Sequence, residues 1–275
     1  MRKLGQCPVI ISVTSLPSRI ARIRLTLVSL LSGVKRPDKV FVSLPYYSAR
    51  ERSEYIIPDF LTDRDFCSDI VEVVRVNEDF GPGTKLLGPL PSLSENSCII
   101  VVDDDAVYRR TFLHNIADAQ LSERDASFSY FTYTVGGIKI GQGCDGFSFW
   151  EPNLRGITEF FRKYVHGTNL VLHDDFWSSM FLATRDIRVK SISHLIGPYD
   201  TIYQQSFEDE GSLRYLAGEF ARDVLQRAHF ARLLKEVEMP TSVRIRLQAG
   251  FQAEQLIVSP ARRLYRKALH VLATR

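Results

Sequence analysis

The stretch CIIVVDDD at residues 98–105 decides the fold, because an apolar run leads directly into three carboxylates. A short, continuous apolar run is typical of a buried strand in an α/β sheet. Ligands of such sheets bind beyond the carboxyl ends of the strands, where Asp103, Asp104 and Asp105 would lie. Three like charges repel each other, and a divalent cation with oxygen ligands would compensate them. The alternative is a solvated acidic turn that caps the following helix.

Apolar runs before this stretch predict three more strands, at residues 8–14, 39–45 and 70–76. Between the first two, a leucine-rich segment predicts a helix whose N-cap is Ser15 or Ser18. Strand, helix and strand form a βαβ unit, so these strands are expected to pair in parallel.

The chain after the aspartates continues to alternate between helical and strand-like patterns. The expected elements are a helix at 112–121, a strand at 127–135 that forms a hairpin with 138–140, a helix at 174–184, a strand-like segment at 187–196 and an amphipathic helix at 212–238. The whole pattern predicts an α/β fold.

Composition narrows the class of protein. The chain has 275 residues, 45% of them hydrophobic, and its net charge of +3 does not indicate a nucleic-acid binder. Four cysteines without a Cys-x-x-Cys pair are typical of a reduced, cytoplasmic protein and not of a disulfide scaffold or a zinc ribbon. The apolar run near the N-terminus is too short for a signal peptide, and no run is long enough to predict a transmembrane helix.

The charge is unevenly distributed, because residues 241–275 carry seven basic side chains and one acid, Glu254. Apolar residues interleave with the arginines in this segment. A basic amphipathic segment can lie on an anionic surface, which predicts peripheral contact with the inner face of the membrane. A helix packed on the body of the protein, with a solvated basic face, would explain the same pattern.

Two glycine-rich segments flank the aspartates. The first, GPGTK at 81–85, leads into a helix, where backbone amides and Lys85 would suit a phosphate. It lacks the Walker pattern, so a plain turn is equally consistent with it. The second, GQGCDG at 141–146, would let the backbone approach a ligand closely or would simply connect a hairpin.

The order of the motifs resembles that of nucleotide-sugar glycosyltransferases of the GT-A type. The triple aspartate looks like their Asp-x-Asp motif, and residues 143–146 look like their glycine loop. His173-Asp174-Asp175 is similar to their x-Glu-Asp motif, with Asp174 in place of the commoner glutamate. His194 lies where these enzymes have a C-terminal metal-binding histidine.

Two further segments, SLPSR at 15–19 and GPGTK at 81–85, look similar to a bacterial capsule or surface-polysaccharide branch of these enzymes. The resemblance implies a Rossmann-like mixed sheet flanked by helices, with a C-terminal helical extension. It implies the following domains: a catalytic domain at 1–205, divided into a nucleotide-binding half at 1–110 and an acceptor half at 111–205, and a basic helical extension at 206–275.

The resemblance also implies the reaction. A sugar would move from a nucleotide-sugar donor, commonly UDP-linked, to a hydroxyl of a glycan or lipid-linked acceptor in surface-polysaccharide synthesis. Mn²⁺ or Mg²⁺ would bridge the donor diphosphate and stabilise the charge that grows on the leaving group.

Individual roles follow from the same resemblance. The implied metal ligands are Asp105, Asp103 and His194, the last of which must be neutral to bind. The implied donor-binding residues are Thr14, Arg19, Lys85, Asp103 and Asp104, with Lys85 at the diphosphate. The implied acceptor loop contains Gly143, Asp145 and Gly146.

An inverting transferase needs a carboxylate base that removes the proton of the acceptor hydroxyl during attack. Asp175 is the first candidate and Asp174 the second. The aspartate at position 174 is one methylene shorter than the usual glutamate, which weakens the case for its supporting role. A retaining reaction would need no base at Asp175, and the sequence leaves the stereochemistry open.

Two other classes of protein fit parts of the sequence. Haloacid-dehalogenase-like phosphatases carry an Asp-x-Asp-x-Val/Thr nucleophile motif, whose letters residues 103–107 match. That motif normally ends the first strand of the fold, whereas three predicted strands precede it here. The other class is a scaffold that binds a sugar nucleotide without turnover. The intact acidic residues at 103–105 and 174–175 argue against this class.

Overall fold

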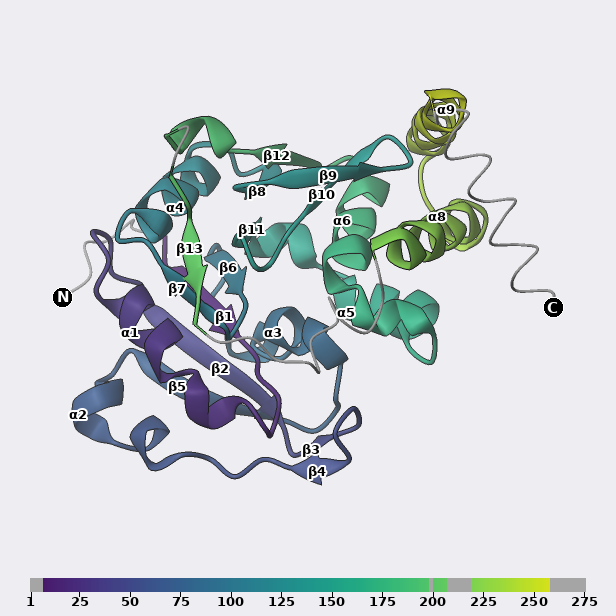
Figure 1. The fold of residues 1–275 in the computed structure, drawn as a ribbon. Coiled ribbons are helices and arrows are strands. Elements are labelled where there is room, and N and C mark those ends of the chain that lie inside the picture. The colour runs from purple at the N-terminus through teal and green to yellow at the C-terminus, as the bar shows by residue number, and fades with distance from the viewer. Residues whose placement is uncertain (1–6, 198–199, 207–218, 258–275) are drawn as a thin grey trace.

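The computed structural model describes residues 7–197, 200–206 and 219–257. At its centre is a seven-stranded sheet with the strand order β12-β8-β11-β6-β1-β2-β5 (Figure 1). In chain order its strands are β1 (Val9–Val13), β2 (Lys39–Pro45), β5 (Val71–Val76), β6 (Cys98–Val102), β8 (Ala126–Ser129), β11 (Phe147–Trp150) and β12 (Arg188–Ser191). Only β11 runs antiparallel to its neighbours, so the sheet is mixed and mostly parallel, as predicted.

The direction of winding reverses between β1 and β6. From β1 the chain proceeds to β2 and β5 on one side, and it then returns to place β6 on the other side of β1. Both strands are parallel, with Val13 opposite Val102 at their carboxyl ends. Such a reversal leaves a crevice outside the strand ends, because the following segments diverge to opposite faces.

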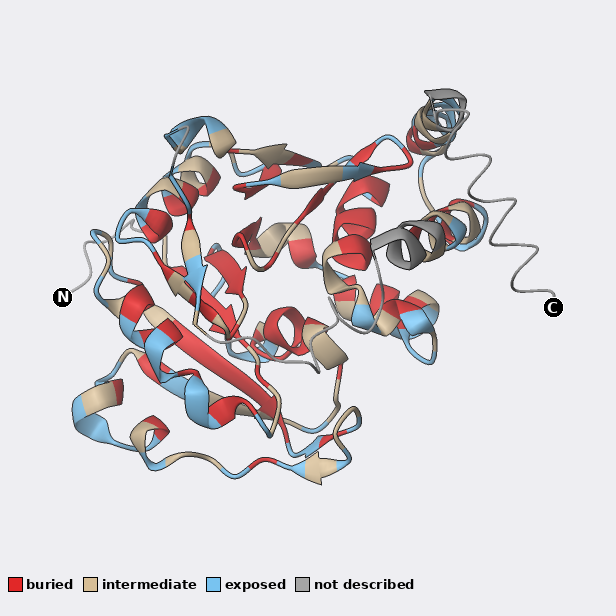
Figure 2. Ribbon diagram, viewed as in Figure 1, coloured by how far each residue is buried: buried red, intermediate tan, exposed pale blue. Residues whose placement is uncertain are grey.

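The side chains of β6 alternate between two hydrophobic cores, as expected for a strand that is covered on both faces. Ile99 and Val101 face one core, whereas Ile100 and Val102 face the other. Figure 2 shows these central strands as almost entirely buried.

Helices cover both faces of the sheet. On the Ile100 face lie α1 (Arg24–Leu31), α2 (Arg64–Cys67) and α4 (Phe112–Ser122). On the Ile99 face lie α3 (Thr84–Leu87), α5 (Ile157–Phe160), α6 (Asp174–Thr184), α8 (Glu219–Glu236) and α9 (Thr241–Ile257). The described part of the chain also contains three small two-stranded sheets: β3 (Tyr47–Ser48) with β4 (Ser53–Glu54), β7 (Ala106–Tyr108) with β13 (Tyr203–Gln205), and β9 (Thr132–Val135) with β10 (Ile138–Gly141).

Three local predictions need correction. The segment predicted as one strand at 127–135 is two strands, because β8 joins the central sheet while β9 pairs with β10. The segment at 187–196 leaves the sheet after Ser191, and His194 lies on a single 3-10 turn. Helix α1 begins at Arg24 without a side-chain cap, and the predicted caps Ser15 and Ser18 instead bond Asp104 and Glu51.

The C-terminal helices pack onto the body of the protein. Phe230 of α8 and Leu247 of α9 belong to the same hydrophobic core as Trp177 of α6. Part of the predicted 212–238 helix, and the basic segment from 258 onward, lie outside the described residues. Among the described helices, none combines the length and apolarity needed to cross a bilayer. The division of the chain at residue 205 stays a prediction.

Candidate active site

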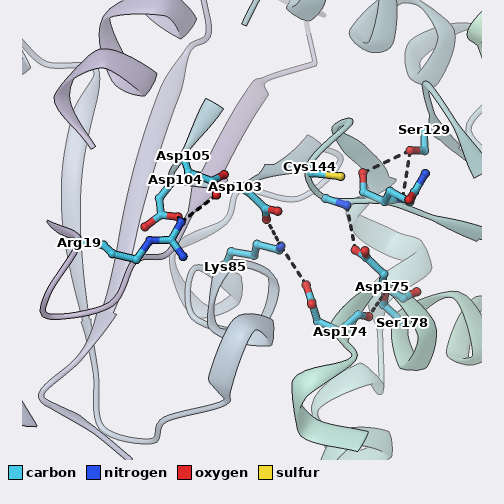
Figure 3. A network of polar contacts seen from close by, with 12 residues as sticks. Arg19, Lys85, Asp103, Asp104, Asp105, Ser129, Cys144, Asp174, Asp175 and Ser178 are labelled. Atoms are coloured by element: carbon cyan, nitrogen blue, oxygen red, sulfur yellow. Dashed lines mark hydrogen bonds and ion pairs between the residues drawn. The ribbon is translucent and has the colours of Figure 1, made fainter. Parts of the chain in front are cut away.

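The candidate site lies at the carboxyl ends of β1 and β6, where the winding of the sheet reverses. The three aspartates follow β6 directly and lead into β7. Figure 3 shows their side chains grouped with Arg19 on one side and with Lys85, Asp174 and Asp175 on the other. The structure therefore brings these predicted residues together from distant parts of the chain.

Asp104 faces inward and is almost fully buried, with 8% of its side chain exposed. Its two carboxylate oxygens accept 2.5 Å hydrogen bonds from the hydroxyl of Ser15 and from Nη2 of Arg19. Burial raises the pKa of Asp104 to about 6, although Arg19 and Ser15 oppose the shift. The expectation that Asp104 contacts the donor does not agree with this inward position, from which it anchors Arg19 to the strand end.

Asp103 and Asp105 are more accessible to a ligand than Asp104. Their side chains are 36% and 21% exposed. Nη2 of Arg19 lies 3.0 Å from Oδ2 of Asp105. Burial and the neighbouring charge of Asp103 raise the pKa of Asp105, although Arg19 opposes the shift.

Lys85 lies between the two acidic motifs and is nearly inaccessible, with 5% of its side chain exposed. Its ammonium is 2.6 Å from Oδ1 of Asp103 and 3.0 Å from Oδ2 of Asp174. Burial alone would lower the pKa of Lys85, but the charges of Asp103, Asp174 and Asp175 raise it well above the ordinary value. Lys85 is therefore a buried, permanently charged cation that joins the two motifs.

The glycine loop holds the carboxylate of Asp175. The backbone N–H of Gly143 donates a 2.8 Å hydrogen bond to Oδ1 of Asp175, at the start of α6. Burial and the charge of Asp174 raise the pKa of Asp175 well above its ordinary value, while the charge of Lys85 works against this shift. A raised pKa makes a carboxylate a stronger base, which is the property a proton acceptor needs.

The rest of the glycine loop is tightly packed. Gly146 has a φ of +78°, and a Cβ there would lie 2.6 Å from the ring of Phe112, so only glycine fits. Asp145 is buried and accepts a 2.8 Å hydrogen bond from the Gln142 amide. Burial and the charge of Asp103 raise the pKa of Asp145 to about 7.

Two tyrosines complete the site, and the sequence did not single them out. The hydroxyl of Tyr108 accepts a 3.2 Å hydrogen bond from the backbone N–H of Asp103 and donates one of 3.1 Å to the carbonyl of Cys144. The ring of Tyr203, on β13, packs against that of Tyr108 with their centroids 5.9 Å apart. A buried tyrosine needs a hydroxyl partner, so the position of Tyr108 just after the aspartates was a usable signal.

Thr14 directly follows β1 at the end of the sheet where the aspartates lie, whereas His194 lies away from them. The Thr14 hydroxyl donates to the carbonyl of Ser43 at 2.8 Å, which ties β1 to β2. His194 is exposed beyond β12, an edge strand that two other strands separate from β6. Among the described residues no group of three His, Cys, Asp or Glu side chains forms a metal site. The expected three-residue metal site that includes His194 is thus not formed.

The remaining residues nevertheless fit a divalent cation. Mg²⁺-type sites in enzymes that act on phosphates commonly use one or two protein carboxylates, with phosphate oxygens supplying further ligands. Asp103 and Asp105 are two accessible carboxylates of this kind. The site's carboxylates (Asp103, Asp104, Asp105, Asp145, Asp174 and Asp175) outnumber its two cations, Arg19 and Lys85. An added cation would relieve this imbalance.

The mixed sheet and its flanking helices are those of GT-A type glycosyltransferases. The mannosyltransferase PcManGT from Pyrobaculum calidifontis, in complex with GDP-Man and Mn²⁺, matches with a TM-score of 0.55 and 16% identity, covering 98% of this chain and 82% of that one. S. aureus TarS 1–349 matches with a TM-score of 0.52 and 14% identity, over 92% of this chain and 73% of that one. Its complex with UDP-GlcNAc gives a TM-score of 0.54 at 14% identity, over 92% and 74%. No protein-family model and no curated protein matches the chain.

Proposed function

We propose that the protein is a metal-dependent glycosyltransferase that moves a sugar from a nucleotide sugar to an acceptor hydroxyl. The observation that carries the proposal is the pairing of two acidic motifs at the strand ends. Asp103 and Asp105 are accessible on one side of Lys85, and Asp174 and Asp175 lie on the other. One group of carboxylates could hold the metal that binds a diphosphate, and the other could supply the base that removes a proton.

On the donor side, Asp103 and Asp105 would hold Mn²⁺ or Mg²⁺. When bound, the cation would stabilise the negative charge that develops on the departing nucleoside diphosphate. The guanidinium of Arg19 lies 3.0 Å from the carboxylate of Asp105 and holds it in place, and Arg19 is itself held by Asp104. The two structures with bound sugar nucleotides contain GDP-Man and UDP-GlcNAc, so donors with either base belong in the test.

On the acceptor side, Asp175 would act as the base. The acceptor oxygen forms a bond to the anomeric carbon while the bond from that carbon to the diphosphate breaks, and the hydroxyl proton passes to Asp175. The hydrogen bond from Gly143 fixes one carboxylate oxygen of Asp175. The raised pKa of Asp175 favours acceptance of that proton.

For the acceptor we propose a glycan or a lipid-linked glycan of a surface polysaccharide, reached at the inner face of the membrane through the basic segment at 241–275. The described part of that segment, α9, carries Arg244 and Arg246. Arg244 donates to the carbonyl of Val237, and Arg246 pairs with Asp186. Both arginines thus contact the protein itself, so membrane contact rests on residues 258–275. Flotation with anionic vesicles, with and without these residues, tests this part alone.

A screen of nucleotide sugars with Mn²⁺, read by nucleotide release, tests the function. A glycosyltransferase releases the nucleotide from one donor, faster with an acceptor glycan present. A haloacid-dehalogenase-like phosphatase would ignore the donors and form a phosphoaspartate at Asp103 from phosphate esters. A scaffold would bind UDP or GDP with Mn²⁺ in calorimetry without turnover. Either of the last two results would overturn the proposal.

A further inference from the structure

Lys85 is the feature of the site that fits its expected role least. A lysine that binds the donor diphosphate must reach the donor, but this ammonium is enclosed between Asp103 and Asp174. We propose that Lys85 is a positioning residue that joins the donor side of the site to its acceptor side, and that residues 81–85 serve to dock α6. The catalytic part of this proposal rests on the glycosyltransferase function proposed above.

The contacts of the ammonium leave little room for a ligand. Its 2.6 Å and 3.0 Å pairs with Asp103 and Asp174 use two of its three N–H donors. With 5% of the Lys85 side chain exposed, a diphosphate would have to displace a carboxylate to reach it. Removing a buried cation from two carboxylates is costly, because each would be left without its partner.

The glycine loop also packs against the ammonium. A Cβ at Gly143 would lie 2.5 Å from Nζ of Lys85 and 3.3 Å from Oδ1 of Asp103. Gly143 is therefore a glycine because Lys85 lies directly against its backbone. The same Gly143 donates its N–H to Asp175, so the strand end, the glycine loop and α6 meet at one buried charge.

The glycines of the 81–85 segment are explained by packing against α6 and the turn before it. A Cβ at Gly83 would lie 2.5 Å from Cζ2 of Trp177, a fully buried side chain of α6. Gly81 has a φ of +59°, and a Cβ there would lie 2.9 Å from Cγ1 of Val171. Both glycines thus allow α3 to approach the α6 region closely. Helix α3 has four residues and is too short to be an anion-binding helix end.

The contacts of Lys85 would align the donor side of the site with its acceptor side. Asp103 would bind the donor through the metal, and Asp175 would accept the proton from the acceptor. Lys85 sets the separation of these groups through Asp103 and Asp174. A displacement of about 1 Å between reacting groups lowers the turnover rate by about 100-fold. Loss of Lys85 should therefore lower the rate of transfer while the donor still binds.

The experiment compares the full-length protein with its Lys85→Met and Lys85→Arg variants. For Lys85→Met we expect calorimetry with UDP or GDP and Mn²⁺ to give a dissociation constant within about threefold of wild type, while kcat for transfer falls about 100-fold. Lys85→Arg keeps the charge and should recover part of kcat. If Lys85→Met instead weakens nucleotide binding about 100-fold and leaves kcat at saturating donor unchanged, Lys85 contacts the diphosphate and the proposal is wrong.

A second measurement does not depend on activity. Gly143→Ala should destabilise the wild-type protein in urea unfolding, because its new methyl group meets Nζ of Lys85. In a Lys85→Met background, where Nζ is absent, the same substitution should cost less. Additive effects of the two substitutions would overturn the proposal. If the wild type uses no nucleotide sugar but this coupling is present, the glycosyltransferase function fails and the structural role of Lys85 stands.

Discussion

The backbone N–H of Gly143 donates a 2.8 Å hydrogen bond to the carboxylate of Asp175, and this contact joins the glycine loop to the start of α6. The loop thereby fixes the orientation of a half-buried carboxylate whose pKa is raised by burial and by the charge of Asp174. An oriented carboxylate with a raised pKa is suited to accept a proton.

Replacing Asp175 with asparagine should separate binding from transfer. The amide keeps the shape of the side chain but cannot accept the acceptor proton, so we expect transfer to fall by about 100-fold or more. Binding of the nucleotide with Mn²⁺ should change little, because Asp175 lies on the acceptor side. Asp118→Asn, at an exposed site on α4, is the matched control. Transfer by Asp175→Asn at the wild-type rate would exclude Asp175 as the base.

The dependence of the transfer rate on pH should follow the ionisation of Asp175. A base acts only when ionised, so the rate should rise as pH increases through the raised pKa of Asp175. The rising limb should therefore lie above the range of an ordinary aspartate, which is about pH 4. A profile of kcat/KM against pH for wild type and Asp175→Asn checks this. A wild-type limb at the ordinary range would contradict the assignment.

Much of the fold could be predicted because it depends on local patterns. The apolar run that forms β6 ends where the polar Asp103 follows it, and the run that forms β2 ends at Pro45. The division of 127–135 between two sheets could not be predicted, because the alternation of its side chains does not indicate which strand each half pairs with.

The positions of the acidic residues in the site could be predicted from the sequence, but the contacts between them could not. The apolar run before Asp103 indicates a strand end, and α6 places Asp175 at a helix start. The inward turn of Asp104 depends on Ser15, whose hydroxyl resembles a helix cap in the sequence alone. The enclosure of Lys85 depends on how closely α3 approaches α6, and this is a tertiary property.

The buried hydrogen bond from Ser15 to Asp104 should contribute to stability. Ser15→Ala would leave a buried carboxylate oxygen without its donor, and we expect the free energy of unfolding to fall by about 1–3 kcal/mol. Ser18→Ala is a matched control, because Ser18 bonds Glu51 at an exposed position. Urea unfolding of both variants checks this. Equal effects would show that the Ser15 hydroxyl is not specially important.

Asp145 should lower the stability of the metal-free protein at higher pH. The pKa of Asp145 is about 7 in the folded protein, above the ordinary value of 3.8, so the folded protein binds this proton more tightly than the unfolded chain. The stability gained from the protonated carboxyl is therefore complete below pH 3.8 and is lost as the pH rises toward 7. Asp145→Asn stays neutral and can still accept the hydrogen bond from Gln142. At about pH 8 the variant should therefore be more stable than wild type, by up to about 4 kcal/mol.

Near pH 4 this advantage should vanish, because wild-type Asp145 is then largely protonated. Urea unfolding with a chelator present, at both pH values, gives the comparison. An equal difference between variant and wild type at the two pH values would mean that Asp145 does not titrate in this range.

The central claim is that Asp103 and Asp105 bind the divalent cation of a glycosyltransferase, and its most direct test is Mn²⁺-dependent nucleotide release by wild type and Asp105→Ala. Both proteins are assayed with the donor found in the screen, after circular dichroism has shown that each is folded. We predict that wild type releases nucleotide only with the metal and that Asp105→Ala loses this release by about 100-fold or more. Release by Asp105→Ala at the wild-type rate, with the same dependence on Mn²⁺, would contradict the account.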